Sequence, residues 1–295
     1  MKLLFLRGKV DSRTQKVLRL SESNDMWTHL ASAIGDTVKI VYWGGSRKVF
    51  YSDSVCEEWV DSFKYWHTEY KPDVVFARGG FPEYDRVVKR FPDAVKIYTG
   101  AGVRTHPKKG DYDIVLVDSV NDLKKGCSLW QKPAAPCFKP LQVPKTFDVC
   151  YVANAQQAKI KRVKWVYETI PKDISMLHLG YLTDYKVPDN VMRVRAERGN
   201  MPELYSQCKM GIIPYSAYDS GPRALSEMLA CGVGPVVVLK DARLSLSGPL
   251  LVSDKEGFWN TVRVNLSTWS QRKAVGATVE TAAKHIRGLI EQVRR

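Results

Sequence analysis

The stretch GPRALSEMLACGVGPVV, from Gly221 to Val237, constrains the fold more than any other part of the chain. Pro222 directly after Gly221 is typical of a helix start, because the N–H group that a proline lacks would have no intrahelical partner in the first turn. Apolar residues then recur at the three-to-four spacing of a buried helix face. The apolar run from Pro235 to Leu239 predicts a buried strand after the helix.

The preceding segment, KMGIIPYSAYDS, predicts a short strand that ends in a loop of small and polar residues. Strand, loop, helix and strand together make a parallel α/β unit, in which the helix starts at the carboxyl end of the first strand. The free N–H groups and partial positive charge of such a helix start suit a phosphate. Two carboxylates accompany it: Asp219 lies before the helix, and Glu227 lies about two turns inside it.

This arrangement resembles the donor-sugar site of GT-B glycosyltransferases, particularly the large retaining group with a Glu-x7-Glu signature. Asp219 matches the first acid, although it is one methylene shorter, and Glu227 matches the second. The resemblance implies that Asp219 is a catalytic-site residue that contacts the transferred sugar, and that Glu227 holds the ribose. It also implies a diphosphate at Ser220, Gly221 and Arg223. The other interpretation is an ordinary α/β unit with a surface aspartate.

Composition sets broad limits on the class of protein. The 295 residues are enough for two domains, and the hydrophobic content of 44% is typical of a soluble globular protein. The N-terminus has too few apolar residues for a signal peptide or a membrane span. The six cysteines are dispersed, which favours reduced thiols over a zinc site or a disulfide framework. We therefore expect a cytoplasmic protein (host cytoplasm if it is viral), without metal or tightly bound cofactor and without stable membrane insertion.

Two series of alternating short strands and helical segments predict two parallel sheets with helices on both faces. Between them, residues 131–145 contain four prolines and little periodicity, which is typical of a linker. The expected fold class is therefore α/β, with the GT-B arrangement of two doubly wound, Rossmann-like domains that face a central cleft. We place the acceptor-side domain at 1–135, the linker at 136–146, the nucleotide-sugar domain at 147–270 and a C-terminal helix at 271–295.

Apolar runs predict the individual strands, at Lys2–Leu6, Thr37–Trp43, Pro72–Ala77, Val95–Thr99, Ile114–Val117, Phe147–Asn154, Met176–Gly180, Val191–Val194, Met210–Pro214 and Pro235–Leu239. Helices are expected at Glu57–Tyr70, Lys159–Ile170, Pro202–Cys208 and about Thr268–Val293. In the first of these helices, Trp59, Phe63 and Trp66 follow helical spacing, and we expect them to pack in the core.

Further donor contacts follow from the resemblance. Related enzymes carry basic groups after the first strand of the second domain, where they offset the charge of the diphosphate leaving group. Lys159 and Arg162 are the expected groups here, with Lys161 and Lys164 as neighbouring alternatives. A solvated basic helix face explains the same residues equally well.

The resemblance also places the remaining parts of the donor. Backbone atoms near Asn200 and Met201 match the turn and helix that cover the nucleobase in the family. Gly8 follows the first strand, where the donor sugar or the acceptor meets the first domain. The expected donor is a nucleotide sugar, with a UDP-sugar preferred.

Two loops of the first domain offer groups for the acceptor. Asp85, Glu83 or His106 would serve as the general base of an inverting enzyme, whereas a retaining enzyme can use the leaving phosphate instead. Basic side chains at the same strand ends are expected to hold acceptor phosphates; these are Arg78, Arg104, Lys108 and Lys109.

The net charge of +14 is shared equally by the two halves of the chain, and it favours a polyanionic partner. We therefore expect transfer to hydroxymethylated pyrimidines in double-stranded DNA, as in bacteriophage DNA modification. The target base would be flipped out of the duplex, with Phe81 or Tyr84 supporting it. Transfer to a cell-envelope glycan or lipid-linked sugar is one alternative. A GT-like binding module without turnover is another, and the oligomeric state is left open.

Overall fold

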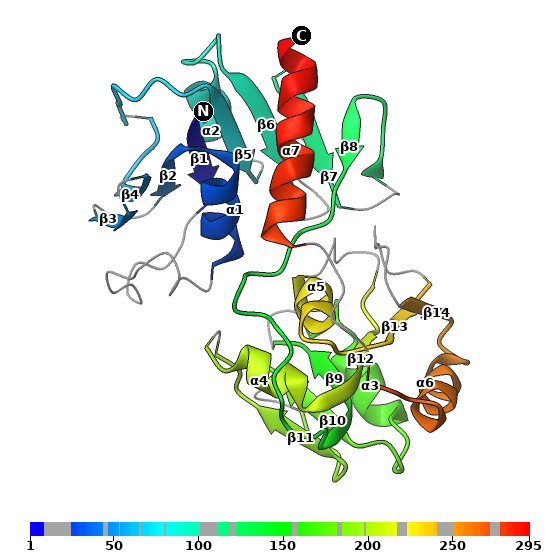
Figure 1. Ribbon diagram of the computed structural model, residues 1–295. Helices are drawn as coiled ribbons and strands as arrows, with labels where there is room; N and C mark the ends of the chain where they lie inside the picture. The colour runs from blue at the N-terminus through cyan, green and yellow to red at the C-terminus, as the bar shows by residue number, and fades with distance from the viewer. Residues whose placement is uncertain are drawn as a thin grey trace. The chain divides into compact units, whose positions relative to one another are not determined.

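The computed structural model describes residues 1–8, 25–43, 47–52, 54–64, 66–79, 81–100, 111–118, 122–154, 158–181, 185–197, 199–216, 223–240, 250–271 and 278–295. The chain forms two units, each built on a largely parallel sheet (Figure 1). Unit 1 contains Met1–Trp130 and Val279–Arg295, and unit 2 contains Gln131–Thr278. The last stretch of the chain therefore belongs to the same unit as the first.

Unit 1 is organised around an eight-stranded sheet with the order β3-β4-β2-β1-β5-β6-β7-β8. Its strands are β1 (Lys2–Arg7), β2 (Thr37–Trp43), β3 (Arg47–Ser52), β4 (Val55–Val60), β5 (Val74–Arg78), β6 (Val95–Thr99), β7 (Ile114–Val117) and β8 (Cys127–Leu129). All neighbours pair in parallel except β3, which runs antiparallel to β4 at the edge. The central strands are almost wholly apolar, as expected for strands that are covered on both faces.

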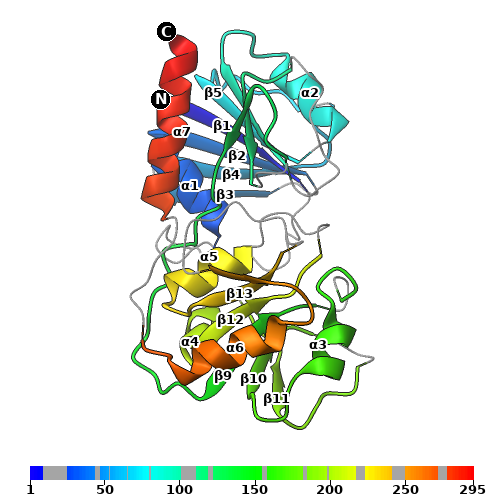
Figure 2. The ribbon, with the colours of Figure 1, turned by 90° about the vertical axis from the view of Figure 1, so that its right-hand side faces the viewer.

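Helices cover both faces of this sheet. Helices α1 (Met26–Ile34) and α7 (Val279–Arg294) lie on one face, and α2 (Pro82–Val88) lies on the other (Figure 2). Asp25 caps α1 by accepting a hydrogen bond from the backbone N–H of Trp27, which satisfies one free donor of the first turn. The Trp27 ring then packs against Phe5 and Phe76 of the central strands, which fixes α1 on the sheet.

Unit 2 has a six-stranded, fully parallel sheet with the order β11-β10-β9-β12-β13-β14. Its strands are β9 (Phe147–Val152), β10 (Met176–Leu179), β11 (Val191–Val194), β12 (Cys208–Ile213), β13 (Val236–Leu239) and β14 (Leu250–Ser253). Its helices are α3 (Val163–Thr169), α4 (Met201–Ser206), α5 (Arg223–Ala230) and α6 (Phe258–Ser267).

Side-chain contacts show which helices of unit 2 share a face. Trp165 of α3 packs against Phe258 and Trp259 of α6, so these two helices lie together. Tyr205 of α4 donates a hydrogen bond to Glu227 of α5 over 3.2 Å, which joins the other pair. The crossovers from β9 to β10 and from β12 to β13 run in opposite directions, so right-handed connections place α3 and α5 on opposite faces, as in a doubly wound fold. The predicted fold class of two doubly wound parallel sheets is confirmed.

The predicted helix at Glu57–Tyr70 is wrong. Val55–Val60 is strand β4, and no helix follows it in the described part of that segment. The segment forms a strand because its side chains alternate between the two faces of the sheet, with Glu57 and Trp59 on the same face. The Trp59 ring stacks on Tyr42 of the neighbouring strand, with 4.7 Å between the ring centres. The predicted core role of the aromatic residues is nevertheless confirmed, because Trp59, Phe63 and Trp66 are all buried.

The predicted C-terminal helix begins much later than expected. Helix α6 ends at Ser267, residues 268–271 are not helical, and α7 starts at Val279. The Trp269 indole N–H donates to the carbonyls of Lys209 and Gly234, so this segment is bonded to unit 2. Elements that we did not predict are α1, α2, α6, β3, β4, β8 and β14.

Helix α7 should stabilise unit 1 although it follows unit 2 in the chain. Ile286 is fully buried, and Arg287 beside it donates to the Ile34 carbonyl at the end of α1. The substitution Ile286→Ala should lower the unfolding free energy by about 2–5 kcal/mol, because it leaves a cavity. The control Val293→Ala removes a side chain that is 44% exposed and should change it by less than about 0.5 kcal/mol. Denaturant unfolding measures both, and equal midpoints would contradict this role of α7.

Candidate functional site

The strand order of unit 2 defines where a ligand site is expected. The chain passes from β9 to β10 in one direction and from β12 to β13 in the other, although β9 and β12 are neighbours. The connections that leave the carboxyl ends of β9 and β12 therefore run in opposite directions along the sheet. In open α/β sheets, ligands bind in the crevice at such a switch point.

The end of β9 is held by a close backbone approach. A Cβ atom at Gly180 would lie 1.8 Å from the carbonyl oxygen of Ala153, so no other residue fits at that position without a shift. Asn154 accepts a hydrogen bond from the backbone N–H of Tyr181 over 3.1 Å. The chain after β10 is therefore fixed against the chain after β9.

A buried histidine supports the same backbone. His178 of β10 is fully buried; its Nε2 lies 2.9 Å from the Ala153 carbonyl, and its Nδ1 contacts the Tyr167 hydroxyl. Since a carbonyl only accepts, Nε2 carries the proton and donates, and Nδ1 accepts from the tyrosine. Burial lowers the pKa of His178 to about 4, so the side chain is neutral near pH 7.

The end of β12 makes matching contacts across the switch point. Tyr215 donates its hydroxyl to the Val152 carbonyl over 2.6 Å, and the backbone N–H of Ser216 donates to the Ile160 carbonyl over 2.9 Å. Ser216 Oγ is buried and has no hydrogen-bond partner among the described residues. A buried hydroxyl without a partner is costly, which makes it a candidate for a ligand contact at this edge.

The basic side chains of residues 159–164, before and at the start of α3, differ in their surroundings. Lys161 is buried, with Nζ 3.9 Å from the centre of the Tyr215 ring. Lys159 is exposed, and Arg162 is half-buried with a left-handed backbone conformation (φ 59°). Lys164 is exposed and forms an ion pair with Glu168 at 3.7 Å. Lys161, which we had ranked behind Lys159 and Arg162, is thus the cation built into the switch point.

Helix α5 carries the described part of the motif that opened the sequence analysis. Arg223 is exposed at its first turn, and Glu227 is half-buried and hydrogen-bonded to Tyr205. Burial and the nearby Glu227 carboxylate raise the pKa of Tyr205, so its hydroxyl remains a donor. Asp219, Ser220 and Gly221 lie outside the described residues.

The two residues that we expected near the nucleobase lie at the start of α4. Asn200 is exposed and precedes the helix, and its side-chain oxygen accepts from the backbone N–H of Glu197 over 2.9 Å. Met201 is half-buried at the first helical position. Because α4 leads into β12, its start lies at the carboxyl edge of the sheet, which is the edge that carries the start of α5.

Unit 1 has its own switch point between β1 and β5. Arg7 and Arg78 end these strands as register partners, and Gly8 follows the first. A Cβ atom on Gly8 would lie 2.9 Å from the Phe81 ring, so the glycine lets that ring cover the end of β1. The Arg78 guanidinium lies 4.8 Å from the centre of the Trp27 ring.

Arg7 is committed to a buried polar network. It is 5% exposed, forms an ion pair with Asp25 and donates to the Tyr42 hydroxyl over 2.8 Å. Tyr42 and Thr28 in turn donate to Glu57 over 2.9 Å and 2.7 Å. Burial raises the pKa of Glu57, although these two hydrogen bonds oppose that shift. These contacts lie within the unit and fix the first strands against α1, although Arg7 Nε is buried without a hydrogen-bond partner among the described residues.

The predicted acceptor groups are only partly described. Asp85 lies inside α2, where it accepts from the Tyr112 hydroxyl over 3.3 Å, and Glu83 is half-buried in the first turn. Tyr84 is buried at 1% exposure, so the expectation that it supports a flipped base is wrong. Phe81 remains half-buried beside it. The remaining acceptor candidates, Arg104, His106, Lys108 and Lys109, lie outside the described residues.

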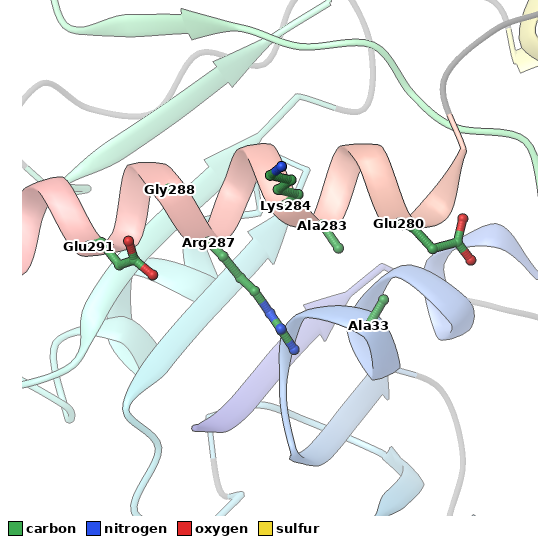
Figure 3. Close-up of a pocket in the computed structure, with 7 residues that line it drawn as sticks. All are labelled: Ala33, Glu280, Ala283, Lys284, Arg287, Gly288 and Glu291. Atoms are coloured by element: carbon green, nitrogen blue, oxygen red, sulfur yellow. The ribbon is translucent and has the colours of Figure 1, made fainter.

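A groove also lies between α1 and α7, with a cavity volume of about 460 Å³ (Figure 3). Its lining includes Glu280, Lys284, Arg287 and Glu291 of α7, and Arg287 is directed toward the end of α1. The groove belongs to the helical layer and not to the carboxyl edge of the sheet, and its charges are mixed.

Within the described ranges, no group of three or more His, Cys, Asp or Glu side chains is placed to hold a metal ion. Nor does any described helix have the length and apolar character to cross a membrane.

Comparisons with known proteins place the fold among GT-B enzymes. No protein-family model and no curated protein sequence matches the chain. Sucrose-phosphate synthase from Thermosynechococcus elongatus is similar over 99% of this chain and 94% of its own, with a TM-score of 0.65 and 12% identity. The catalytic domain of starch synthase IV from Arabidopsis thaliana, bound to ADP and acarbose, gives 0.64 and 10% identity, with 100% and 99% coverage. HepE from Anabaena, in complex with UDP and glucose, gives 0.59 and 12% identity, with 100% and 98% coverage.

Sequence reasoning missed several residues at the switch point of unit 2. His178, Tyr167 and Tyr215 act through contacts between separate elements, and a single sequence carries no signal for such contacts. Gly180 was detectable, because a glycine directly after a buried strand often marks a close backbone approach.

Protonation of His178 should destabilise the protein in mild acid. Its pKa is about 4 when folded, against 6.5 for an unperturbed histidine, so the unfolded chain binds the proton first as pH falls. This group should therefore leave the unfolding free energy unchanged above pH 6.5 and lower it by about 3 kcal/mol between pH 6.5 and 4. Urea unfolding across this range measures the slope, and His178→Gln should remove that part of it. Parallel slopes in the two proteins would contradict the assignment.

Proposed function

We propose that this protein is a glycosyltransferase that moves a sugar from a nucleotide-sugar donor to a hydroxyl acceptor. The observation that carries the proposal is the fold likeness over 99–100% of the chain to three GT-B enzymes. Two of these structures hold a nucleoside diphosphate, and the third enzyme is named as a synthase of a sugar phosphate. The likeness extends over both units, so it supports more than a common α/β domain.

The donor would lie at the switch point of unit 2. Transfer breaks the bond between the anomeric carbon and the diphosphate, forms a bond to the acceptor oxygen and releases the acceptor proton. Negative charge then builds up on the diphosphate, and fixed cations stabilise it. Lys161 is the buried cation among the described residues of this edge; Arg162 follows it in the chain, and Arg223 lies at the start of α5.

The two carboxylates of the motif would contact different parts of the donor. We propose that Glu227 binds the ribose hydroxyls, since it lies in α5 and is held by Tyr205 of α4. Asp219 would contact the transferred sugar, as in the retaining Glu-x7-Glu group. A retaining reaction would use the leaving phosphate to accept the proton, whereas an inverting one would use Asp85 or His106.

We further propose hydroxymethylated pyrimidines in DNA as the acceptor. Its support is the net charge of +14, which favours a polyanion. Arg78 at the end of β5 would contact a phosphate, together with Arg104, Lys108 and Lys109. Phe81 is the aromatic side chain that would stack on a flipped base. None of the six cysteines forms a disulfide, which supports a reducing compartment such as the cytoplasm.

Nucleotide binding tests the donor proposal. A panel of UDP-, ADP-, GDP- and CMP-sugars should contain at least one ligand that raises the thermal midpoint, since ligand at 100 times its dissociation constant stabilises by about 2.7 kcal/mol. Glu227→Ala should then weaken nucleoside diphosphate binding by about 1.5–3 kcal/mol, the cost of a charge-assisted hydrogen bond. Asp219→Ala should mainly lower turnover. The exposed Glu203 of α4 provides the control, because Glu203→Ala removes a carboxylate of the same type and should bind normally.

Each arm of this experiment can contradict the proposal. If no nucleotide sugar binds, the donor site is wrong. Equal loss of binding in the Glu227 and Asp219 variants would overturn the division of roles. If the wild-type protein binds a nucleotide sugar but neither hydrolyses it nor transfers its sugar, the protein is a binding module.

Salt dependence tests the acceptor. If DNA phosphates bind the basic side chains, the log–log slope of affinity against salt should be about −0.9 per phosphate contact. The double variant Lys108→Ala/Lys109→Ala should reduce that slope by about two units without changing donor hydrolysis. Labelled sugar should pass only to hydroxymethylated DNA, although unmodified DNA should bind equally well. Salt-independent binding, or transfer to an envelope glycan alone, would overturn the DNA proposal.

A further inference from the structure

Tyr181 is an exposed aromatic residue at the edge where the donor would bind. It follows Gly180 at the end of β10, and 57% of its surface is exposed. Among the large hydrophobic side chains that are exposed in the described part of the chain, the aromatic ones are Tyr181 and Trp43, and only Tyr181 belongs to unit 2. Isolated exposed aromatic rings are common, so its backbone and its neighbours must decide whether it has a role.

The backbone of Tyr181 is fixed although its ring is exposed. Asn154 accepts from its N–H over 3.1 Å, and Gly180 before it passes so close to Ala153 that a Cβ atom would lie 1.8 Å from that carbonyl oxygen. His178, three residues earlier, binds the same carbonyl over 2.9 Å. The ring is therefore presented from a backbone that several contacts hold in place, which limits the entropy lost when a ligand stacks on it.

A cation accompanies the ring. Arg195 follows β11, the strand next to β10, and is itself exposed. Its guanidinium carbon lies 5.8 Å from the centre of the Tyr181 ring, within the range of a cation–π contact. The guanidinium lies over the phenol ring, so the two groups together present flat surfaces with polar N–H donors at the margin. Flat heteroaromatic rings with carbonyl and ring-nitrogen acceptors match such a surface.

The position fits the base end of a nucleotide. The diphosphate is proposed between β9 and β12, and β10 and β11 lie on the far side of β9. Two strand spacings, from β12 to β10, amount to about 10 Å. This is the reach of a ribose with its 5′-phosphate. The start of α4, where the base was expected from the sequence, lies at the same edge.

We propose that Tyr181 and Arg195 form the nucleobase platform: the base of the nucleoside diphosphate stacks on the Tyr181 ring, and Arg195 contacts its polar margin. This inference rests on the proposed donor site and adds the residues that recognise the base. It also means that the base is bound mainly through its flat face. Stacking is tolerant of base identity, so discrimination between bases falls to Arg195.

Binding of UDP, ADP and pyrophosphate to four variants tests the platform. Tyr181→Ala should weaken UDP and ADP binding at least about fivefold, since stacking of one base is worth about 1–3 kcal/mol. Tyr181→Phe keeps the ring and should bind within about twofold of wild type. Arg195→Ala should alter the ratio of UDP to ADP affinity. Met192→Ala is the matched control, because Met192 is 56% exposed on β11 but lies within the strand.

Pyrophosphate has no base, so it separates stacking from structural damage. Its binding, measured by competition with UDP, should be the same in wild type and Tyr181→Ala. Equal weakening of UDP and pyrophosphate would overturn the platform and indicate a structural role for Tyr181. Unchanged UDP and ADP binding in Tyr181→Ala would also overturn it, but would leave the proposed function standing. Absence of any nucleoside diphosphate binding by the wild-type protein would instead remove the proposed function, and the platform with it.

Discussion

Parallel pairing of neighbouring strands is the constraint on which both units depend. Two parallel strands cannot be joined by a tight turn, so each needs a crossover that returns the chain to the opposite edge. The carboxyl ends of all strands except the antiparallel β3 therefore lie on one edge of each sheet. In unit 2 the crossovers part between β9 and β12, and the candidate site residues Asn154, Lys161 and Ser216 lie near that point. The strand order therefore determines where the site lies, and the side chains determine what it can bind.

The two switch points differ in how they use charge. In unit 1, Arg7 is nearly inaccessible and its charge is matched inside the unit by Asp25, with Tyr42 and Glu57 completing the network. Such a network fixes the geometry of the strand end, because removing one member leaves another charge buried without a partner. In unit 2, Lys161 lies against the Tyr215 ring, next to a buried hydroxyl. The first arrangement is suited to structure, and the second is better suited to a ligand.

The sequence was sufficient for elements whose signal is local. Apolar runs predicted β2, β7 and β11 with the observed bounds, and the Gly–Pro start followed by helical periodicity predicted α5. The sequence-based prediction failed where the helical and the strand periodicity of side chains both fit the same segment. Trp59, Phe63 and Trp66 fit a helix by spacing, but Glu57 needs Thr28 and Tyr42 as partners, and only the strand provides them. The same limit applies to the site, because the contacts of His178 and Lys161 join elements that only the fold brings together.

The return of α7 to unit 1 has a consequence for synthesis on the ribosome. Unit 2 is contained in a single uninterrupted stretch, whereas unit 1 needs residues 279–295 to cover α1. Unit 2 can therefore complete its core while the last helix is still inside the ribosome, although most of unit 1 has emerged earlier. Nascent domains usually fold in the order in which they emerge. Here the first-made half must wait, with the apolar face that α7 will cover still accessible to chaperones, until that helix has emerged.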